Sequence, residues 1–303
     1  MPEPTTGVNY LRFVLHGETD GILMTRKRPA SLALPVPETK EIRFLLKTMI
    51  SRGIRKIRLT GDDPALREDL PEIVGMVAGL EQVREVALTT QGIGLKSRVE
   101  ELADRGLQCI NFNLDTLKAS RYRTLTGAAK FKEVWGAVEE ALSHELNVKI
   151  NAVIQRGVND DEMADFILLT KKEPIQVRFI EWNYDTDVIA PPKRFFSVRE
   201  SMSTVKPPLI PRTPRALDGP ALVYEIPGHR GTVGFIPNVT EHFCPSCNRV
   251  GLTDMGEILS CLFGRGLSLM RYMQGKSGTA NVTAFIDRVL RRKEVLATKM
   301  AGM

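Results

Sequence analysis

The chain has 303 residues, of which 43% are hydrophobic and 26% charged, and its formal net charge is +6 with a pI of about 9.2. These values are ordinary for a globular protein and exclude a disordered chain of low hydrophobicity. No run of 18 or more apolar residues occurs, so we expect no membrane span. The N-terminus lacks the charged-then-apolar pattern of a signal peptide, so we expect a cytoplasmic protein.

From residue 8 to about residue 182, short β-type runs alternate with helical segments. This alternation is typical of βα units that build a parallel sheet, so the predicted class is α/β. Six such units form either an open sheet or part of a barrel. The expected strands are 8–15, 54–60, 86–90, 109–114, 148–154 and 175–182. The expected helices are 38–51, 70–80, 95–104, 131–143 and 161–171.

Polar and apolar residues alternate within these strands, unlike the continuous apolar runs of a sheet buried on both faces. One face is apolar and suits packing against helices. The other face carries polar side chains, namely Arg58, Thr89, Asn111, Asn113, Lys149, Asn151 and Arg178. Unpaired charges are too costly for a dry core. This face therefore either lines a cavity for a polar, anionic ligand or is neutralised internally by Asp115 or Glu181, and the pattern leaves both open.

The amino-acid composition of the chain changes after Trp182. Residues 185–220 are rich in proline, which indicates a linker. Short β-type pieces at 222–226 and 232–236, a cysteine-containing segment and a basic helical end follow. We predict three parts, namely residues 1–184, the linker 185–220 and a smaller α+β domain at 221–303. The basic end is either a solvated helix face or a means of attracting an anionic partner.

Three of the four cysteines, Cys244, Cys247 and Cys261, form a C-x2-C-x13-C array. Clustered thiols of this kind predict a metal or iron–sulfur site rather than disulfides. The spacing leaves zinc and a [4Fe–4S] cluster open, and His242 or His229 would supply a fourth ligand to zinc. Cys109 lies in an apolar run and is interpreted as a small buried hydrophobe.

Several stretches resemble the radical S-adenosylmethionine GTP 3′,8-cyclase (MoaA) family of molybdenum-cofactor biosynthesis. The most specific are Arg55–Gly61 (RKIRLTG), Leu66–Leu70 (LREDL), Arg178–Glu181 (RFIE), Gly231–Ile236 (GTVGFI), Phe243–Arg249 (FCPSCNR) and Cys261–Gly264 (CLFG). The resemblance implies an incomplete (βα)6 TIM-like barrel, closed by the C-terminal domain. It also implies that Cys244, Cys247 and Cys261 hold an auxiliary [4Fe–4S] cluster, with zinc as the less favoured alternative.

The resemblance fails at the family's first cluster, which uses a C-x3-C-x2-C loop after the first strand. The three ligand positions are Thr19, Leu23 and Arg26 here, and none of them can donate a thiolate. Without three thiolates we expect no radical-initiating cluster at this loop and no bound S-adenosylmethionine. Radical cyclase activity is therefore not expected.

Other contacts that the family makes to S-adenosylmethionine also differ. Thr25 stands where the family has an aromatic residue in this loop. Gly61-Asp62-Asp63-Pro64 stands where the family has a glycine-glycine-glutamate-proline stretch. Asn113 replaces a serine, and Asn183 replaces a methionine. The changes are concentrated at the site of one ligand.

The positions that contact the nucleotide in the family keep their residue types. They are Arg12, Arg58, Thr89, Lys149 and Arg249. Two further features differ from the family. Gly251 replaces the second arginine of an arginine-x-arginine pair, and the chain ends Ala301-Gly302-Met303 where the family has a pair of glycines. The remaining cations would repel one another in an empty pocket, which an anion would relieve. Asp62 and Asp63 offer a rival, internal neutralisation.

The sequence thus predicts a family member that binds a purine nucleotide or a similar anionic small molecule and holds one [4Fe–4S] cluster. Its expected role is binding, sensing or partnership. The alternatives are an active cyclase-type enzyme, or another reaction at the auxiliary cluster. A nucleic-acid-binding role is not expected, because no helix-turn-helix or aromatic–basic pattern occurs. A homodimer is left open.

Overall fold

The computed structural model describes residues 7–15, 38–183, 192–215, 217–241, 247–261, 266–273 and 278–301. The chain divides into two compact units, which are described separately. Unit 1 comprises residues 1–89, 105–107 and 245–303, and unit 2 comprises residues 90–104 and 108–244. No helix in the described ranges is both long and apolar enough to cross a membrane.

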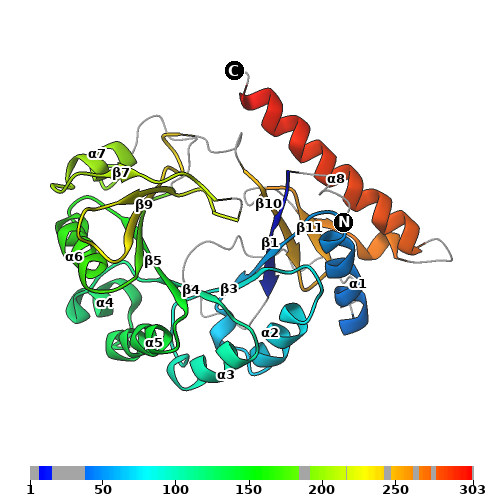
Figure 1. The fold of residues 1–303 in the computed structure, drawn as a ribbon, viewed down its shortest axis with the longest axis horizontal. Coiled ribbons are helices and arrows are strands. Elements are labelled where there is room, and N and C mark those ends of the chain that lie inside the picture. The colour runs from blue at the N-terminus through cyan, green and yellow to red at the C-terminus, as the bar shows by residue number, and fades with distance from the viewer. Residues whose placement is uncertain are drawn as a thin grey trace. The chain divides into compact units, whose positions relative to one another are not determined.

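The described residues of unit 1 form strands in the order β12-β11-β10-β1-β2-β3. Figure 1 labels β11, β10, β1 and β3. Strand β1 is parallel to both β2 and β10, and β2 is parallel to β3, whereas β10, β11 and β12 are antiparallel to one another. The C-terminal strand β10 thus continues the N-terminal parallel sheet. The bounds are β1 Tyr10–Leu15, β2 Lys56–Gly61, β3 Glu85–Thr90, β10 Arg249–Thr253, β11 Glu257–Leu259 and β12 Leu267–Ser268.

Unit 2 repeats this plan with the order β4-β5-β6-β9-β8-β7. Strands β4, β5, β6 and β9 are parallel, and β8 and β7 are added as an antiparallel edge. The bounds are β4 Cys109–Asn113, β5 Asn147–Ile154, β6 Gln176–Glu181, β7 Ile210–Pro211, β8 Leu222–Glu225 and β9 Thr232–Ile236.

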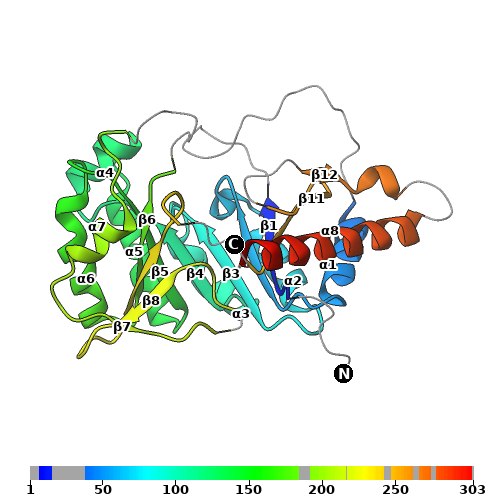
Figure 2. The ribbon, with the colours of Figure 1, turned by 90° about the horizontal axis from the view of Figure 1, so that it is seen from above.

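Helices cover the apolar side of each sheet. In unit 2, helices α4 to α7 lie along the outer side of the strands (Figure 1). In unit 1, Arg52, which follows α1, forms an ion pair with Asp287 of the long helix α8. Figure 2 labels both helices. The bounds are α1 Thr39–Ile50, α2 Leu70–Ala78, α3 Val99–Asp104, α4 Ala119–Thr126, α5 Phe131–Ser143, α6 Met163–Lys172, α7 Val198–Ser203 and α8 Gly278–Ala301.

The alternation within the strands decides which side is covered. Ile57 and Leu59 of β2 are fully buried, as are Leu45 and Leu46 of α1, because apolar side chains on one face of a strand pack on the apolar stripe of a helix. Gly61 ends β2 with a φ of +141°, and a Cβ there would lie 1.9 Å from the carbonyl oxygen of Leu15. Only glycine fits this position, which fixes the turn that follows β2.

The predicted α/β class and the six βα repeats are confirmed. Helix α4 was not predicted, because its sequence ASRYRTLT carries too few apolar residues to show a helical stripe. The C-terminal strands were assigned to a separate domain, whereas β9 pairs with β6 and β10 pairs with β1. The three-part division at residues 184 and 220 stays a prediction.

A buried carboxylate connects two segments of unit 2. Glu162 is fully buried and accepts hydrogen bonds from the Thr116 hydroxyl and the Leu117 N–H, each at 2.7 Å, and also from the Arg121 guanidinium. Charge-assisted hydrogen bonds of this kind are stronger than neutral ones and stabilise the fold only while every partner is present.

We therefore expect Glu162→Gln to lower the free energy of unfolding by about 1.5–3 kcal/mol, because the amide weakens the bond to Arg121. The matched control is Asp165→Asn, an exposed position on the neighbouring helix, with an expected change within about 0.5 kcal/mol. Urea unfolding followed by circular dichroism measures both. Equal effects of the two substitutions would contradict this role of Glu162.

Candidate functional site

Two arginines stand side by side on the polar face of unit 1. Parallel pairing puts Arg12 of β1 opposite Arg58 of β2, and Tyr10 opposite both Lys56 and Arg249. Register partners in a sheet point to the same face. The structure thus brings together four of the five predicted contacts, Arg12, Arg58, Thr89 and Arg249, on one face of one unit.

Electrostatics make this face unfavourable without a partner anion. Burial, together with the like charges of Arg58 and Arg249, lowers the pKa of Arg12 to about 10 against an opposing effect of Tyr10. Arg12 nevertheless stays charged at neutral pH. Its Nη2 lies 3.4 Å from the Thr60 hydroxyl, which is a weak hydrogen bond.

Among the described residues, the buried atoms without a hydrogen-bond partner include polar atoms on this face. The Nε of Arg58 and the Oγ1 of Thr89 are two such atoms. An unsatisfied buried donor costs free energy, so such atoms are typical of a site that a ligand completes. Arg58 also lies over the ring of Tyr10, with its Cζ 5.3 Å from the ring centroid.

Tyr10 was not predicted as a site residue. Its ring holds both Lys56 and Arg58 through cation–π contacts, and it is 1% exposed. The available signal was its spacing, because Tyr10 lies two residues before Arg12 and therefore on the same face of the strand. Lys56 is neutralised by Glu85 at 2.8 Å and is equally buried.

Unit 2 carries the fifth predicted contact, Lys149, on its own polar face. Lys149 is the register partner of Asn111 and Gln176. Beside it, Arg178 donates hydrogen bonds to Gln176 and to Asn111, at 2.9 and 2.8 Å. Asn151 donates to Asn113 at 3.0 Å. This face is a hydrogen-bonded polar layer.

The two carboxylates considered as internal neutralisers have other roles. Asp115 accepts the N–H of Val153 at 2.8 Å, and burial raises the pKa of Asp115 to about 6 although this hydrogen bond lowers it. Glu181 accepts the backbone N–H groups of Val198, Val239 and Thr240. Backbone donors engage both side chains, so neither carboxylate is assigned as a counter-charge of the polar face, and the ligand-lined alternative stays a prediction.

The aspartates Asp62 and Asp63 follow β2. Asp63 is buried and accepts the N–H of Ala65 at 3.2 Å, so it caps the short 3-10 helix Pro64–Leu66. This contact gives Asp63 a local structural role. Thr19, Leu23, Thr25 and Arg26 lie outside the described residues.

The predicted metal ligands flank the β10–β11 hairpin. Cys247 lies just before β10 and Cys261 just after β11, and the pairing of Gly251 with Leu259 brings both to the open end of the hairpin. Cys244 and His242 lie outside the described residues. His229, the other candidate fourth ligand, forms a 2.7 Å hydrogen bond to the Thr170 hydroxyl in unit 2.

Basic groups surround the Cys247 thiol. Burial raises its pKa, but the charges of Arg249 and Lys293 and the hydrogen bonds from Arg249 outweigh burial, so the net pKa is lowered. Lys293 of α8 also donates to the carbonyl oxygen of Ser260, at 2.8 Å, next to Cys261. A favoured thiolate suits metal ligation, so Cys247 fits the predicted cluster. Lys293 had no sequence signal beyond the basic helix.

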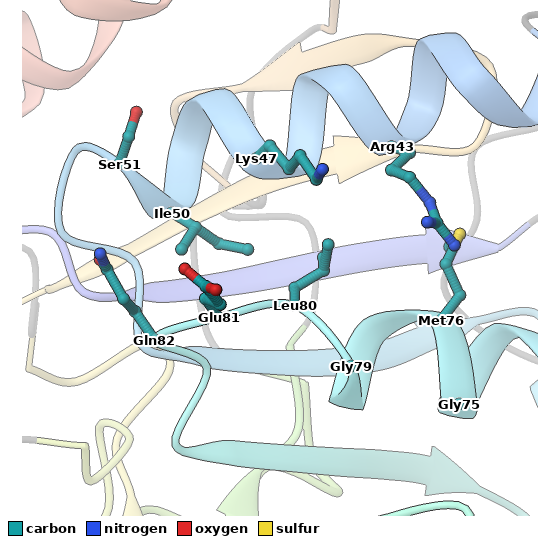
Figure 3. Close-up of a pocket in the computed structure, with 10 residues that line it drawn as sticks. All are labelled: Arg43, Lys47, Ile50, Ser51, Gly75, Met76, Gly79, Leu80, Glu81 and Gln82. Atoms are coloured by element: carbon teal, nitrogen blue, oxygen red, sulfur yellow. The ribbon is translucent and has the colours of Figure 1, made fainter.

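A separate groove of about 600 Å³ lies between α1 and α2 (Figure 3). Exposed Arg43 and Lys47 line one side, and Met76 and Leu80 line the other. None of the predicted contacts lines it. It is a groove between helices rather than part of the polar strand face.

Two protein-family models match the chain. The Radical SAM superfamily matches residues 26–170, and Molybdenum Cofactor Synthesis C matches residues 175–298. The GTP 3′,8-cyclase of Pelotomaculum thermopropionicum is 36% identical over 265 residues, which cover 84% of this chain and 80% of that protein. Human Molybdenum cofactor biosynthesis protein 1 is 34% identical over 84% of this chain, but only 41% of its own length is matched.

Among solved structures, Streptococcus suis SuiB bound to S-adenosylmethionine superposes with a TM-score of 0.60 at 13% identity. The match covers 93% of this chain and 68% of SuiB. At this identity the likeness shows the fold alone. The predicted TIM-like fold of radical-SAM type is confirmed, and the iron–sulfur part of that prediction stays a prediction.

The lowered pKa of Cys247 has a measurable consequence. In metal-free protein we expect Lys293→Met to raise this pKa and slow alkylation of Cys247 by iodoacetamide at pH 7, because less thiolate is present. Arg291→Met, on the exposed side of the same helix, should leave the rate unchanged. Mass spectrometry of the peptide containing Cys247 gives the rates. An unchanged rate in Lys293→Met would contradict the electrostatic cause.

Proposed function

Because this chain belongs to the GTP 3′,8-cyclase (MoaA) family of molybdenum-cofactor biosynthesis, we propose that it is a member with a binding, sensing or partner role rather than radical catalysis. It binds a purine nucleotide or a similar anion at Arg12, Arg58, Thr89, Arg249 and Lys149. It holds one [4Fe–4S] cluster at Cys244, Cys247 and Cys261. It has lost the first cluster and the S-adenosylmethionine site.

One observation carries the nucleotide claim, namely the pairing of Arg12 with Arg58 on one face. Their like charges and the unpartnered Nε of Arg58 disfavour an empty face. A phosphate offers oxygens to both guanidiniums, and arginine pairs with phosphate through two parallel hydrogen bonds. The unpartnered hydroxyl of Thr89 offers a further contact.

The claim of a lost cluster rests on donor chemistry. Threonine, leucine and arginine at positions 19, 23 and 26 present no thiolate, and a [4Fe–4S] cluster is held by cysteine thiolates. The residues present therefore do not fit the first cluster. Reductive cleavage of S-adenosylmethionine needs that cofactor, because the protein positions it but does not replace it.

The cysteines at the auxiliary site suit an iron–sulfur cluster better than the residues at positions 19, 23 and 26 do. The lowered pKa of Cys247 and the meeting of Cys247 and Cys261 at one hairpin end support thiolate ligation. With three cysteines, one iron stays open to a ligand, which is the chemistry that such a cluster would supply. Zinc is the alternative, and metal analysis separates the two.

Arg58→Gln should weaken GTP binding by about 10- to 100-fold, because it removes a charge-assisted contact of roughly 1.5–3 kcal/mol. The matched control is Arg43→Gln, an exposed arginine of unit 1 that lines the groove between α1 and α2. It should bind as the unaltered protein does. Isothermal titration calorimetry measures the dissociation constants. The proposal fails when the unaltered protein takes up no GTP, or when both variants weaken binding equally.

The second candidate function is an active cyclase-type enzyme, which the 36% identity to a GTP 3′,8-cyclase favours. The two functions differ in one product. Incubation with GTP, S-adenosylmethionine and dithionite yields 5′-deoxyadenosine only when a radical is initiated. We expect none above the level of a protein-free reaction, and its formation in excess would favour the enzyme.

A further inference from the structure

Positive charge is concentrated at the C-terminal end of the chain, around helix α8. Residues 266–303 contain seven Lys and Arg residues but two acidic ones, so this segment supplies most of the formal net charge of +6. One of the acids, Asp287, forms an ion pair with Arg52. Among the described residues, Arg288 and Arg292 have no ion-pair partner. The charge of these two arginines is therefore open to solvent or to an anionic partner.

An aromatic pair lies on the same side of α8 as these arginines. Phe285, Arg288 and Arg292 follow the i, i+3, i+7 spacing of one helix face. The ring of Phe285 stacks on that of Tyr272, with centroids 4.7 Å apart and an interplanar angle of 26°. Tyr272 is 40% exposed, and both arginines are exposed. We call these four residues the α8 patch.

The α8 patch is a product of the fold and is not visible in the sequence. Tyr272 and Phe285 are 13 positions apart, and the packing of the short 3-10 helix Met270–Tyr272 on α8 brings their rings together. The surface thus has an aromatic–basic combination that the sequence lacks. Such a combination is typical of sites for single-stranded nucleic acid, where bases stack on rings and phosphates pair with guanidiniums.

The apolar face of α8 argues against a lipid surface as the partner. A helix that binds in the plane of a membrane inserts its apolar face into the lipid. In α8 that face is formed by Val282, Ile286 and Leu290, which are fully buried. The helix itself lies at the outside of unit 1 (Figure 2). An anion that binds the polar side of the helix therefore fits better than a bilayer does.

We propose that the α8 patch binds single-stranded nucleic acid without sequence preference. Phosphates contact Arg288 and Arg292, and a base stacks on Tyr272, whose ring is supported by Phe285. Like charges at positions i and i+4 disfavour a helix, so the phosphates also relieve the repulsion between the two arginines. None of these residues belongs to the polar strand face, and the proposal does not rest on the nucleotide proposed there.

Fluorescence anisotropy with a labelled oligouridine of about 12 nucleotides, a length within the usual site size, tests the arginines in the full chain. Arg288→Gln with Arg292→Gln should weaken binding by about 10-fold. The slope of log K against log salt should become shallower by about 1.4, because each phosphate contact contributes roughly 0.7. Arg43→Gln with Arg84→Gln removes two other exposed arginines of unit 1 and should change neither quantity. Equal losses in both double variants would overturn the proposal.

The stacking contact is tested through Tyr272. Tyr272→Ala should weaken oligouridine binding by roughly 5- to 150-fold, the usual contribution of one stacked base, and leave the salt slope unchanged. Tyr272→Phe keeps the ring and should bind as the unaltered protein does. Circular dichroism checks that both variants are folded. Equal affinities of the two folded variants would contradict the stacking role.

Vesicles that contain phosphatidylserine separate a lipid surface from a nucleic acid. We expect them to bind the unaltered protein no better than they bind the Arg288→Gln, Arg292→Gln variant. The proposal is overturned when the oligouridine does not bind at about 0.1 M salt, where exposed charges are screened beyond about 10 Å. It is equally overturned when the vesicles bind and the oligouridine does not.

Discussion

The placement of two arginines on adjacent parallel strands is the constraint on which this account depends. Backbone pairing fixes Arg12 opposite Arg58, so the two side chains start from neighbouring points on one face. At a strand spacing of about 5 Å, two like charges repel by roughly 3 kcal/mol at an effective dielectric constant of about 20. The ring of Tyr10 offsets part of this cost through its contact with Arg58. We propose that a bound anion offsets the rest.

The positions that depart from the family pattern and those that keep its residue types fall in different parts of the chain. The altered cluster positions fall within residues 19–26 of the sequence, whereas four of the five proposed nucleotide contacts lie on β1, β2, β3 and β10, whose hydrogen bonds hold them in register. Substitutions outside the strands need not disturb the sheet. The proposed loss of one cofactor site is thus compatible with the fold and with the proposed anion site.

Much of the fold was predictable because polar and apolar residues largely alternate along the strands. The alternation of apolar Ile57 and Leu59 with polar Arg58 predicts both the strand and the face that is buried. The joining of β10 to β1 was not predictable, because 232 residues lie between Leu15 and Asn248 in the chain and pairing partners at such distance leave no local pattern. The same pairing sets Gly251 beside Arg12.

The residues of the candidate site were predictable from the sequence, but the residues that pack around them were not. Arg12, Arg58 and Thr89 could be assigned to one face from strand periodicity. Tyr10 could have been assigned to that face by the same periodicity. Lys293 could not have been predicted, because a basic residue in a basic helix is ordinarily solvated. Only the packing of α8 brings Lys293 to Cys247.

Iron and acid-labile sulfide analysis of anaerobically purified protein tests the central claim most directly. The account predicts about four irons and four sulfides per chain, all lost together when Cys247 is replaced by serine. About eight irons per chain would show that a second cluster is held after all, and one zinc in place of iron would contradict the retained cluster.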